Sequence, residues 1–179
     1  MSNVWFVGDL HWGHRNITKF RPFDTEEEHR RVTKANLIGC LKKRDTLWIL
    51  GDSVFTGGAL KDLQDVIDAC ADVRCTIGNH CGQHMDAEEY NRFIGMFSKV
   101  YGITKKYKCW LAHAPIHPDE LRGNLCVHGH VHTETIQIPD ETFVGRTRDD
   151  PRYFNMSLEN HNYMPRDLRW LRGEIENRR

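Results

Sequence analysis

Three short apolar segments near the start of the chain end in the same way, with a glycine followed by a side chain that can bind a metal ion. These pairs are Gly8-Asp9, Gly51-Asp52 and Gly78-Asn79. In α/β sheets, ligands bind beyond the carboxyl ends of the strands, so the three side chains are expected to converge on one crevice. Glycine also lets the backbone come close to a ligand. The pattern favours a sheet whose strand ends form a site.

Histidines extend this pattern along the chain. His11 follows Asp9 by two residues, and His113 ends a later apolar run. In Val127–His132 every second residue is a histidine, and these histidines would share one face if the backbone stayed extended. The candidate ligands number more than the roughly four that one tetrahedral zinc needs, so they suit two ions that share a carboxylate. The candidates are Asp9, His11, Asp52, Asn79, His113, His130 and His132.

The order of the expected elements indicates two packed sheets flanked by helices. Apolar runs predict strands, which lie at 4–7, 46–50, 73–77, 108–112, 124–128 and 153–158, with a hairpin within 134–143. Amphipathic or capped segments predict helices, which lie at 25–43, 60–71, 87–96 and after Pro165. Strands and helices alternate early and strands dominate later, which argues against a plain doubly wound sheet. Residues 1–179 are expected to form a single domain.

Composition narrows the class of protein. Lys+Arg and Asp+Glu balance at 25 each, so no global field attracts nucleic acid or an anionic membrane. No segment approaches the roughly 20 apolar residues of a membrane-spanning helix, and the N-terminus does not resemble a signal peptide. The six cysteines lack C-x-x-C spacing and are interpreted as free thiols of a reducing compartment. We therefore expect a cytoplasmic protein that makes no membrane contact.

Taken together, the motifs resemble the calcineurin-like metallophosphoesterases. The blocks occur in the order typical of that family and are Asp9-x-His11, Gly51-Asp52, Gly78-Asn79-His80, His113 and Gly129-His130-x-His132. The resemblance implies an α/β fold, a four-layer α/β/β/α sandwich with two mixed sheets and a dinuclear metal site at the strand ends. It also implies the ligand sets. Asp9, His11 and His132 would hold the first metal, Asn79, His113 and His130 the second, and Asp52 would bridge them.

By the same resemblance, His80 is the candidate catalytic residue, which would hydrogen-bond the phosphate and protonate the leaving group. The family often has acidic residues after the Gly-Asn-His triplet and shortly after the bridging aspartate. This chain has Cys81 in the first place and Ser53-Val54-Phe55 in the second. The sequence therefore identifies no acidic partner for His80.

The ligand types and the chemistry of phosphate esters define the expected reaction. Two cations about 3.5–4 Å apart can clamp the phosphate oxygens and activate a shared water. Mixed nitrogen and oxygen ligation suits manganese, iron, zinc, cobalt or nickel, and the lack of a thiolate ligand favours manganese. We expect a metal-bridging hydroxide to attack a phosphate monoester or diester in line, with no covalent enzyme intermediate. His80 would stabilise the transition-state oxygens or donate a proton.

A further set of polar residues is expected to surround the substrate. The candidates for substrate binding are Asn79, His80, His14 and Arg21. Arg15 and Asn16, next to His14, could also reach a substrate phosphate. The alternative for this group of residues is that they are ordinary surface loop residues after a strand. The segment after the last metal block offers Asn155, Ser157 and His161 as supports for the site through hydrogen bonds.

Three functions stay open at this point. A hydrolase of a nucleotide or other small phosphoester is favoured, because little chain is left to build a large substrate platform. A nuclease would need a basic or aromatic groove, and the small basic cluster at Lys105, Lys106 and Lys108 more simply solvates a face. A non-catalytic metal-binding module is disfavoured, because every ligand position carries a suitable residue. The oligomeric state is left open.

Overall fold

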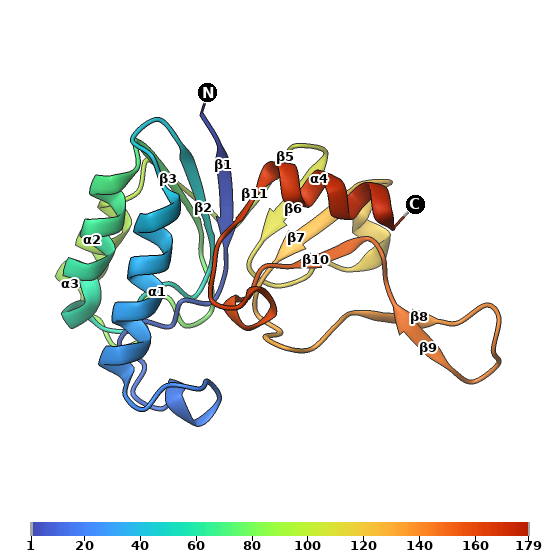
Figure 1. The fold of residues 1–179 in the computed structure, drawn as a ribbon, viewed down its shortest axis with the longest axis horizontal. Helices are drawn as coiled ribbons and strands as arrows, with labels where there is room; N and C mark the ends of the chain where they lie inside the picture. Colours follow the sequence, from blue (N-terminus) through green and yellow to red (C-terminus); the bar gives the residue numbers. More distant parts are fainter. Residues whose placement is uncertain (1, 179) are drawn as a thin grey trace.

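The computed structural model describes residues 2–178, which form two sheets packed against each other, with helices alongside (Figure 1). The first sheet has the order β11-β1-β2-β3-β4, and only the β11–β1 pair is antiparallel. Its strands are β1 (Val4–Val7), β2 (Thr46–Leu50), β3 (Asp72–Thr76), β4 (Lys99–Tyr101) and β11 (Arg166–Asp167). The three central strands are parallel, so their carboxyl ends lie at one edge.

The second sheet has the order β10-β7-β6-β5, and its β5–β6 pair is antiparallel while the others are parallel. Its strands are β5 (Ile103–Lys106), β6 (Cys109–Ala112), β7 (Leu125–His128) and β10 (Tyr153–Asn155). A separate antiparallel hairpin of β8 (Gln137–Pro139) and β9 (Thr147–Asp149) projects from the body as an arm (Figure 1). Both larger sheets are thus mixed, as expected.

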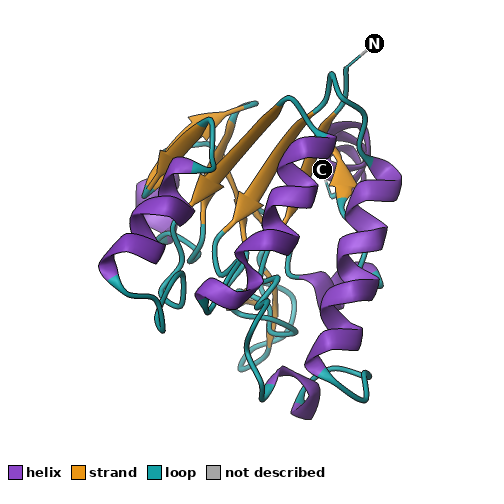
Figure 2. Cartoon of the chain, turned by 90° about the vertical axis from the view of Figure 1, so that its left-hand side faces the viewer, coloured by secondary structure: helices purple, strands orange, loops and turns teal. Residues whose placement is uncertain are grey.

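In the described part of the chain, four α-helices flank the sheets. Helices α1 (Glu26–Cys40), α2 (Leu60–Ala69) and α3 (Ala87–Gly95) cover the outer face of the first sheet (Figure 2), and α4 (Leu168–Asn177) lies beside the second sheet. Their starts follow from capping: the side chain of Thr25 accepts a hydrogen bond from the backbone N–H of Glu28, and Asp86 forms a capping box with Glu89. Short 3-10 helices complete the chain: η1 (Ile17–Lys19), η2 (Gly57–Ala59), η3 (Pro118–Leu121) and η4 (Leu158–His161).

The core has two main parts, one on each side of the first sheet. Side chains alternate along β2, so Leu47 and Ile49 pack among the helices, whereas Trp48 and Leu50 pack between the sheets. Leu171 of α4 joins the cluster between the sheets. Because both faces of the central strands are buried, β2 reads as a continuous apolar run rather than an alternating one.

Most expected elements are present, with shifted ends. Helix α1 ends at Cys40, three residues before the expected end, because Leu41 adopts an extended backbone. The arm is a hairpin, but its strands pair 137–139 with 147–149 rather than within 134–143. Strands β4, β5 and β11 were not expected, since each has at most four residues and none is fully buried. Among the described residues, no helix is long and apolar enough to cross a bilayer.

Candidate metal centre

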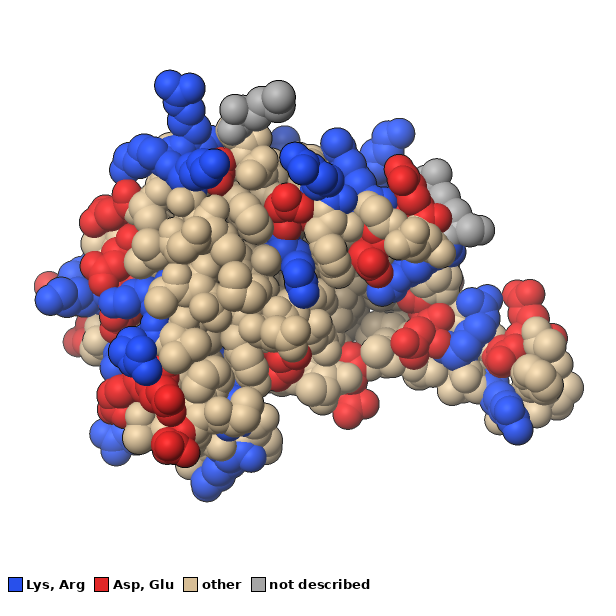
Figure 3. Space-filling model, viewed as in Figure 1, with Lys and Arg blue, Asp and Glu red and all other residues tan. Residues whose placement is uncertain are grey.

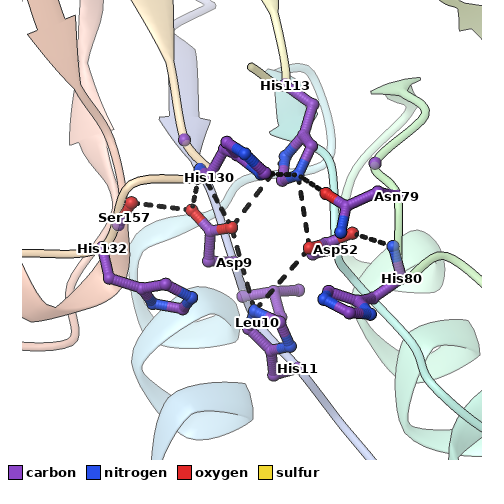
Figure 4. A network of polar contacts seen from close by, with 12 residues as sticks. Asp9, Leu10, His11, Asp52, Asn79, His80, His113, His130, His132 and Ser157 are labelled. Atoms are coloured by element: carbon purple, nitrogen blue, oxygen red, sulfur yellow. Dashed lines mark hydrogen bonds and ion pairs between the residues drawn. The ribbon is translucent and has the colours of Figure 1, made fainter. Parts of the chain in front are cut away.

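The seven candidate ligands lie together where the two sheets meet, on loops that follow the carboxyl ends of strands (Figure 4). Loops after β1, β2 and β3 carry the ligands of the first half of the chain, and loops after β6 and β7 carry the rest. The structure therefore brings side chains up to about 120 residues apart into one site, since the backbone N–H of His130 hydrogen-bonds Asp9 across 121 residues.

Most of these candidate ligands have an uncommon backbone conformation. Five of the seven have positive φ angles, a left-handed region that non-glycine residues rarely adopt. They are Asp9 (56°), His11 (53°), Asp52 (43°), His130 (74°) and His132 (50°). Such backbone costs free energy and is typical of functional sites held by the surrounding fold. It turns each loop sharply toward the centre as soon as its strand ends.

This backbone also corrects the expectation for the last block of histidines. Strand β7 ends at His128, and the chain beyond it is not extended. His128 is buried inside the protein, with its Nδ1 atom 2.8 Å from the carbonyl oxygen of Gly129. Only His130 and His132 reach the site, so the three histidines do not share one face.

Three glycines make room for the candidate ligands because they have no side chain. A Cβ atom on Gly51 would overlap the ring of His113, one on Gly78 would overlap the carboxylate of Asp52, and one on Gly129 would overlap the carboxylate of Asp9. Of these three, only Gly51 has a positive φ. The glycines are thus required mainly for the close approach of loop and ligand, and less for turning the chain.

Both central carboxylates are held by protein hydrogen bonds and have an oxygen that also faces histidines; at Asp9 this oxygen, Oδ1, lies 3.1 Å from the backbone N–H of His130. Oδ2 of Asp9 accepts hydrogen bonds from Ser157 Oγ (2.7 Å) and from the backbone N–H of His130 (2.9 Å). Oδ1 of Asp52 accepts one from the backbone N–H of His80 (2.8 Å). Burial raises the pKa of Asp9. Burial also acts to raise the pKa of Asp52, but its hydrogen bond and charge interaction with His113 outweigh this, and the net pKa is lowered.

The contacts of His113 gather several potential metal-binding atoms around one nitrogen. Its Nδ1 atom lies 3.1 Å from the carbonyl oxygen of Leu50, which can only accept, so Nδ1 carries the proton. Its Nε2 atom then faces Asn79 Oδ1 (2.9 Å), Asp52 Oδ2 (3.2 Å) and His130 Nδ1 (3.1 Å). Burial acts to lower the pKa of His113, but its hydrogen bond and charge interaction with Asp52 outweigh this, and the net pKa is raised. Positive charge at this point is therefore favoured, carried by a proton on Nε2 in the free protein. A metal ion in place of that proton would be surrounded by the same donor atoms.

His11 supports the same conclusion on the other side of the two carboxylates. It is buried, and neither ring nitrogen has a hydrogen-bond partner among residues 2–178. Burial is the main cause that lowers its pKa to about 3, so the ring is neutral with a free lone pair. Its Nε2 lies 3.9 Å from Asp9 Oδ1 and 3.8 Å from Asp52 Oδ2. Ligands about 2.0–2.2 Å from one cation stand roughly 3–4 Å apart, so these spacings fit a metal ion.

The donor atoms fall into two groups that overlap at the carboxylates. Atoms of Asp9, His11 and His132 lie within 4.8 Å of one another, as do atoms of Asp9, Asp52 and His113. Oδ2 of Asp52 lies between His11 and His113, at 3.8 Å and 3.2 Å from their Nε2 atoms. The arrangement therefore has room for two ions with a carboxylate between them.

Glu159 is a residue of the site that the sequence did not indicate. Its Oε1 atom lies 2.9 Å from His132 Nδ1 and 2.8 Å from Arg21 Nε. Burial acts to raise the pKa of Glu159, but the hydrogen bond from His132 and the charge of Arg21 outweigh this and lower the pKa to about 2. Carboxylates behind metal-binding histidines orient the ring and increase its basicity. Nothing in the local sequence marks this lone glutamate, which η4 places beside the site.

Arg21 has a different place from the one expected. Its side chain is buried, and it donates hydrogen bonds to the carbonyl oxygens of Asp9 (2.7 Å) and Leu10 (3.2 Å) as well as to Glu159. Its Nη1 atom also lies 2.8 Å from Nε2 of His29. With its donors engaged inside the protein, Arg21 braces the loop after β1 and does not face a substrate. This corrects the expectation that it would reach a substrate phosphate.

His80 lies at the edge of the site. Its ring stacks on Phe55 at 5.3 Å between centroids, and its Nδ1 lies 2.5 Å from Oε1 of Gln83. The acidic partner sought in the sequence is thus replaced by a neutral amide. His14 lies nearby, with its ring 5.7 Å from that of His11, and lines the same hollow as His80.

The residues expected to support the site form a chain behind Asp9. Ser157 Oγ contacts both Asp9 and Asn155 Oδ1 (2.6 Å), and Asn155 Nδ2 donates to the carbonyl oxygen of His132 (2.7 Å). Nε2 of His161 lies 2.9 Å from the carbonyl oxygen of Asn155. These hydrogen bonds link the loop after β10 to the loops that carry Asp9 and His132.

Comparison with known proteins agrees with this geometry. A sequence model of the family described as calcineurin-like phosphoesterase matches residues 2–177. The gene 66 protein of Mycobacterium phage L5 is 31% identical, covering 76% of this chain and 80% of that protein, and the gene 66 protein of Mycobacterium phage D29 is 26% identical, covering 98% of each.

Two solved structures have a similar fold. A protein of unknown function from Aquifex aeolicus superposes with a TM-score of 0.68 at 21% identity, covering 97% of this chain and 99% of that one. A phosphopantetheinyl hydrolase from Mycobacterium tuberculosis superposes with a TM-score of 0.50 at 12% identity, covering 93% of this chain and 95% of that one. At these identities the likeness concerns the fold alone.

Proposed function

This chain belongs to the calcineurin-like phosphoesterase family, and we propose that it hydrolyses a small phosphate ester, a nucleotide or a similar metabolite, at the candidate metal centre. One observation carries the proposal. Nε2 of His113 faces oxygen and nitrogen atoms of three side chains at 2.9–3.2 Å, and all of these atoms are of the kind that bind divalent cations. Two divalent cations held by the seven ligands account for it.

Asp9, His11 and His132 would hold one ion, Asn79, His113 and His130 the other, and Asp52 would contact both. When bound, such a pair neutralises charge on the phosphate and makes water more acidic. Nitrogen and oxygen donors suit manganese, which we favour over iron, zinc, cobalt or nickel.

His80 is the group of this chain that we propose acts on the leaving group. Oε1 of Gln83 can only accept a hydrogen bond, so the adjacent Nδ1 of His80 donates its proton to it. This orients the ring and leaves Nε2 for the substrate. When the ring binds a second proton at Nε2, that proton can stabilise the transition-state oxygens or pass to the departing alkoxide, which leaves the neutral ring with its proton on Nδ1. Phe55 limits the motion of the ring by stacking on it.

A nuclease on the same scaffold receives less support. On the face shown in Figure 3, acidic and basic side chains are interspersed and form no basic stripe. The balance of 25 basic and 25 acidic residues agrees with this. Binding of nucleic acid depends largely on contacts between basic side chains and phosphates.

A cytoplasmic location is also part of the proposal. All six cysteines are free, and five of them are buried, as is common in a reducing compartment. Titration of thiols in unfolded protein isolated without reductant checks this: six reactive thiols per chain are expected, and intramolecular disulfides would contradict it.

The test of the proposed function is hydrolysis of 4-nitrophenyl esters of phosphate by protein loaded with manganese. Release of 4-nitrophenolate from the monoester or the diester, abolished by a chelator and by Asp52→Asn, is the expected result. A protein that binds two ions and hydrolyses neither ester would instead be a non-catalytic metal-binding module.

A further inference from the structure

Two hollows adjoin the candidate metal centre, one beside each expected ligand set. The first, of about 440 Å³, is lined by His11, His80 and His132. The second, of about 400 Å³, is lined by Asn79, His113 and His130. Figure 4 shows these two sets of side chains on opposite sides of Asp9 and Asp52. A phosphate held at the centre therefore has space on both sides.

Both hollows have apolar walls. The first includes Phe20, whose side chain is 76% exposed, and the second includes Ile103, which is 47% exposed. Among the described residues only four large hydrophobic side chains are at least 47% exposed, and these two of them lie beside the centre. A ligand that covers exposed apolar side chains removes them from water, and this makes its binding more favourable.

The charges around the hollows disfavour a second anion. Within residues 2–178, neither hollow is lined by a lysine or an arginine. The first is instead lined by two carboxylates, the exposed Glu134 and the more buried Glu159. The nearby Arg15 lines a different hollow, whose lining includes none of the seven candidate ligands. A substituent with its own phosphate would thus lose hydration without gaining a cationic partner.

We propose that the substrate is a phosphodiester with two uncharged, partly apolar substituents, one in each hollow. This inference rests on the proposed function and narrows its substrate class. A monoester fills only one hollow and leaves the other apolar wall exposed to water. A diester covers both walls, and binding free energy from groups remote from phosphorus can then be used to orient the reacting centre.

Esters that share one leaving group test the inference. The probes are the 4-nitrophenyl ester of thymidine 5′-phosphate and the same compound with an added 3′-phosphate, with bis(4-nitrophenyl) phosphate and 4-nitrophenyl phosphate alongside. We expect kcat/KM to fall about tenfold or more when the 3′-phosphate is added, a loss of roughly 1.4 kcal/mol. We also expect kcat/KM to be higher for the two diesters without an added phosphate than for the monoester, 4-nitrophenyl phosphate. Equal or faster turnover of the 3′-phosphorylated compound, or preference for the monoester, would overturn the inference.

Substitutions in the two walls provide a second test. Phe20→Asp and Ile103→Asp are each expected to raise KM for bis(4-nitrophenyl) phosphate several-fold, with little change in metal content. Phe143→Asp is the matched control, because Phe143 is 54% exposed on the arm and lines neither hollow. If both wall variants behave like the control, the inference is wrong. Metal-loaded wild-type protein that hydrolyses none of the four esters would contradict the proposed function itself and the inference with it.

Discussion

The Nδ1 atom of His132 lies 2.9 Å from the Oε1 atom of Glu159, across 27 residues of sequence. An ionised carboxylate only accepts hydrogen bonds, so Nδ1 carries the proton and Nε2 is left free for a metal ion. Arg21 contacts the same Oε1 atom and also holds the carbonyl oxygen of Asp9. The loop after β1, the loop after β7 and helix η4 are therefore tied together behind the centre, and this link has measurable consequences.

Removal of the buried guanidinium of Arg21 should lower the stability of the folded protein. Arg21→Met leaves the Glu159 carboxylate buried without its cation, and we expect a loss of about 3 kcal/mol in the free energy of unfolding of the metal-free protein. Glu159→Gln in the same chain should recover part of the loss, since the uncompensated charge is gone. Urea unfolding measures both, with Arg15→Met, on the exposed loop, as control. A stable Arg21→Met protein with only a raised KM would restore Arg21 as a substrate ligand.

The same carboxylate should make stability depend on acid pH. The pKa of Glu159 is lowered from 4.5 to about 2 in the folded protein, mainly because the hydrogen bond from His132 and the charge of Arg21 outweigh burial. A lowered pKa stabilises the fold above the unfolded value, and that contribution is lost as the pH falls from about 4.5 toward 2, by at most about 3 kcal/mol. Between about pH 4.5 and 2, the free energy of unfolding of the metal-free protein should change less with pH in Glu159→Gln than in the wild-type protein. The same pH dependence in the variant and the wild-type protein would contradict the lowered pKa of Glu159.

The glycines beneath the ligands should tolerate no side chain. Gly78→Ala and Gly129→Ala place a methyl group against the carboxylates of Asp52 and Asp9, so we expect each variant to lose metal and activity. Gly173→Ala, in helix α4 with no atom within 4 Å of the added Cβ, should keep both and gain up to about 1 kcal/mol of stability. Elemental analysis and thermal unfolding separate the two cases. Full metal content in both site variants would show that the loops have more room than the structure indicates.

The pair of His80 and Gln83 should affect rate more than metal binding. His80→Ala is expected to lower kcat by about 10²–10³ while two ions stay bound, because the lost group acts on the leaving oxygen. Gln83→Ala should lower kcat less, and Gln83→Glu, which keeps an acceptor for Nδ1, should recover most of the rate. Gln64→Ala, on helix α2, is the control. Loss of metal from His80→Ala would mean that His80 has another role.

The sequence predicted the framework of the site because apolar runs followed by glycine and a ligand mark strand ends. The strands that carry Asp9 and Asp52 were found at 4–7 and 46–50, and the structure has the same bounds. Short strands such as β4 and β11 were missed, since two or three partly exposed residues carry little pattern.

The supports of the site were harder to predict than its ligands. Glu159 and Gln83 are ordinary polar residues in sequence, and only the fold brings them to His132 and His80. The position of Arg21 shortly after the first ligand block predicts a substrate contact, whereas its burial depends on contacts with carbonyl oxygens that no pattern encodes. The left-handed backbone at His130 likewise could not be inferred from alternating histidines.

The number and position of bound ions test the central claim most directly. Anomalous diffraction from crystals grown with excess manganese should show two peaks per chain, each about 2.0–2.3 Å from its ligand atoms. Asp9, His11 and His132 should surround one peak, Asn79, His113 and His130 the other, with Asp52 contacting both. A single peak, or two peaks away from these seven side chains, would contradict the account.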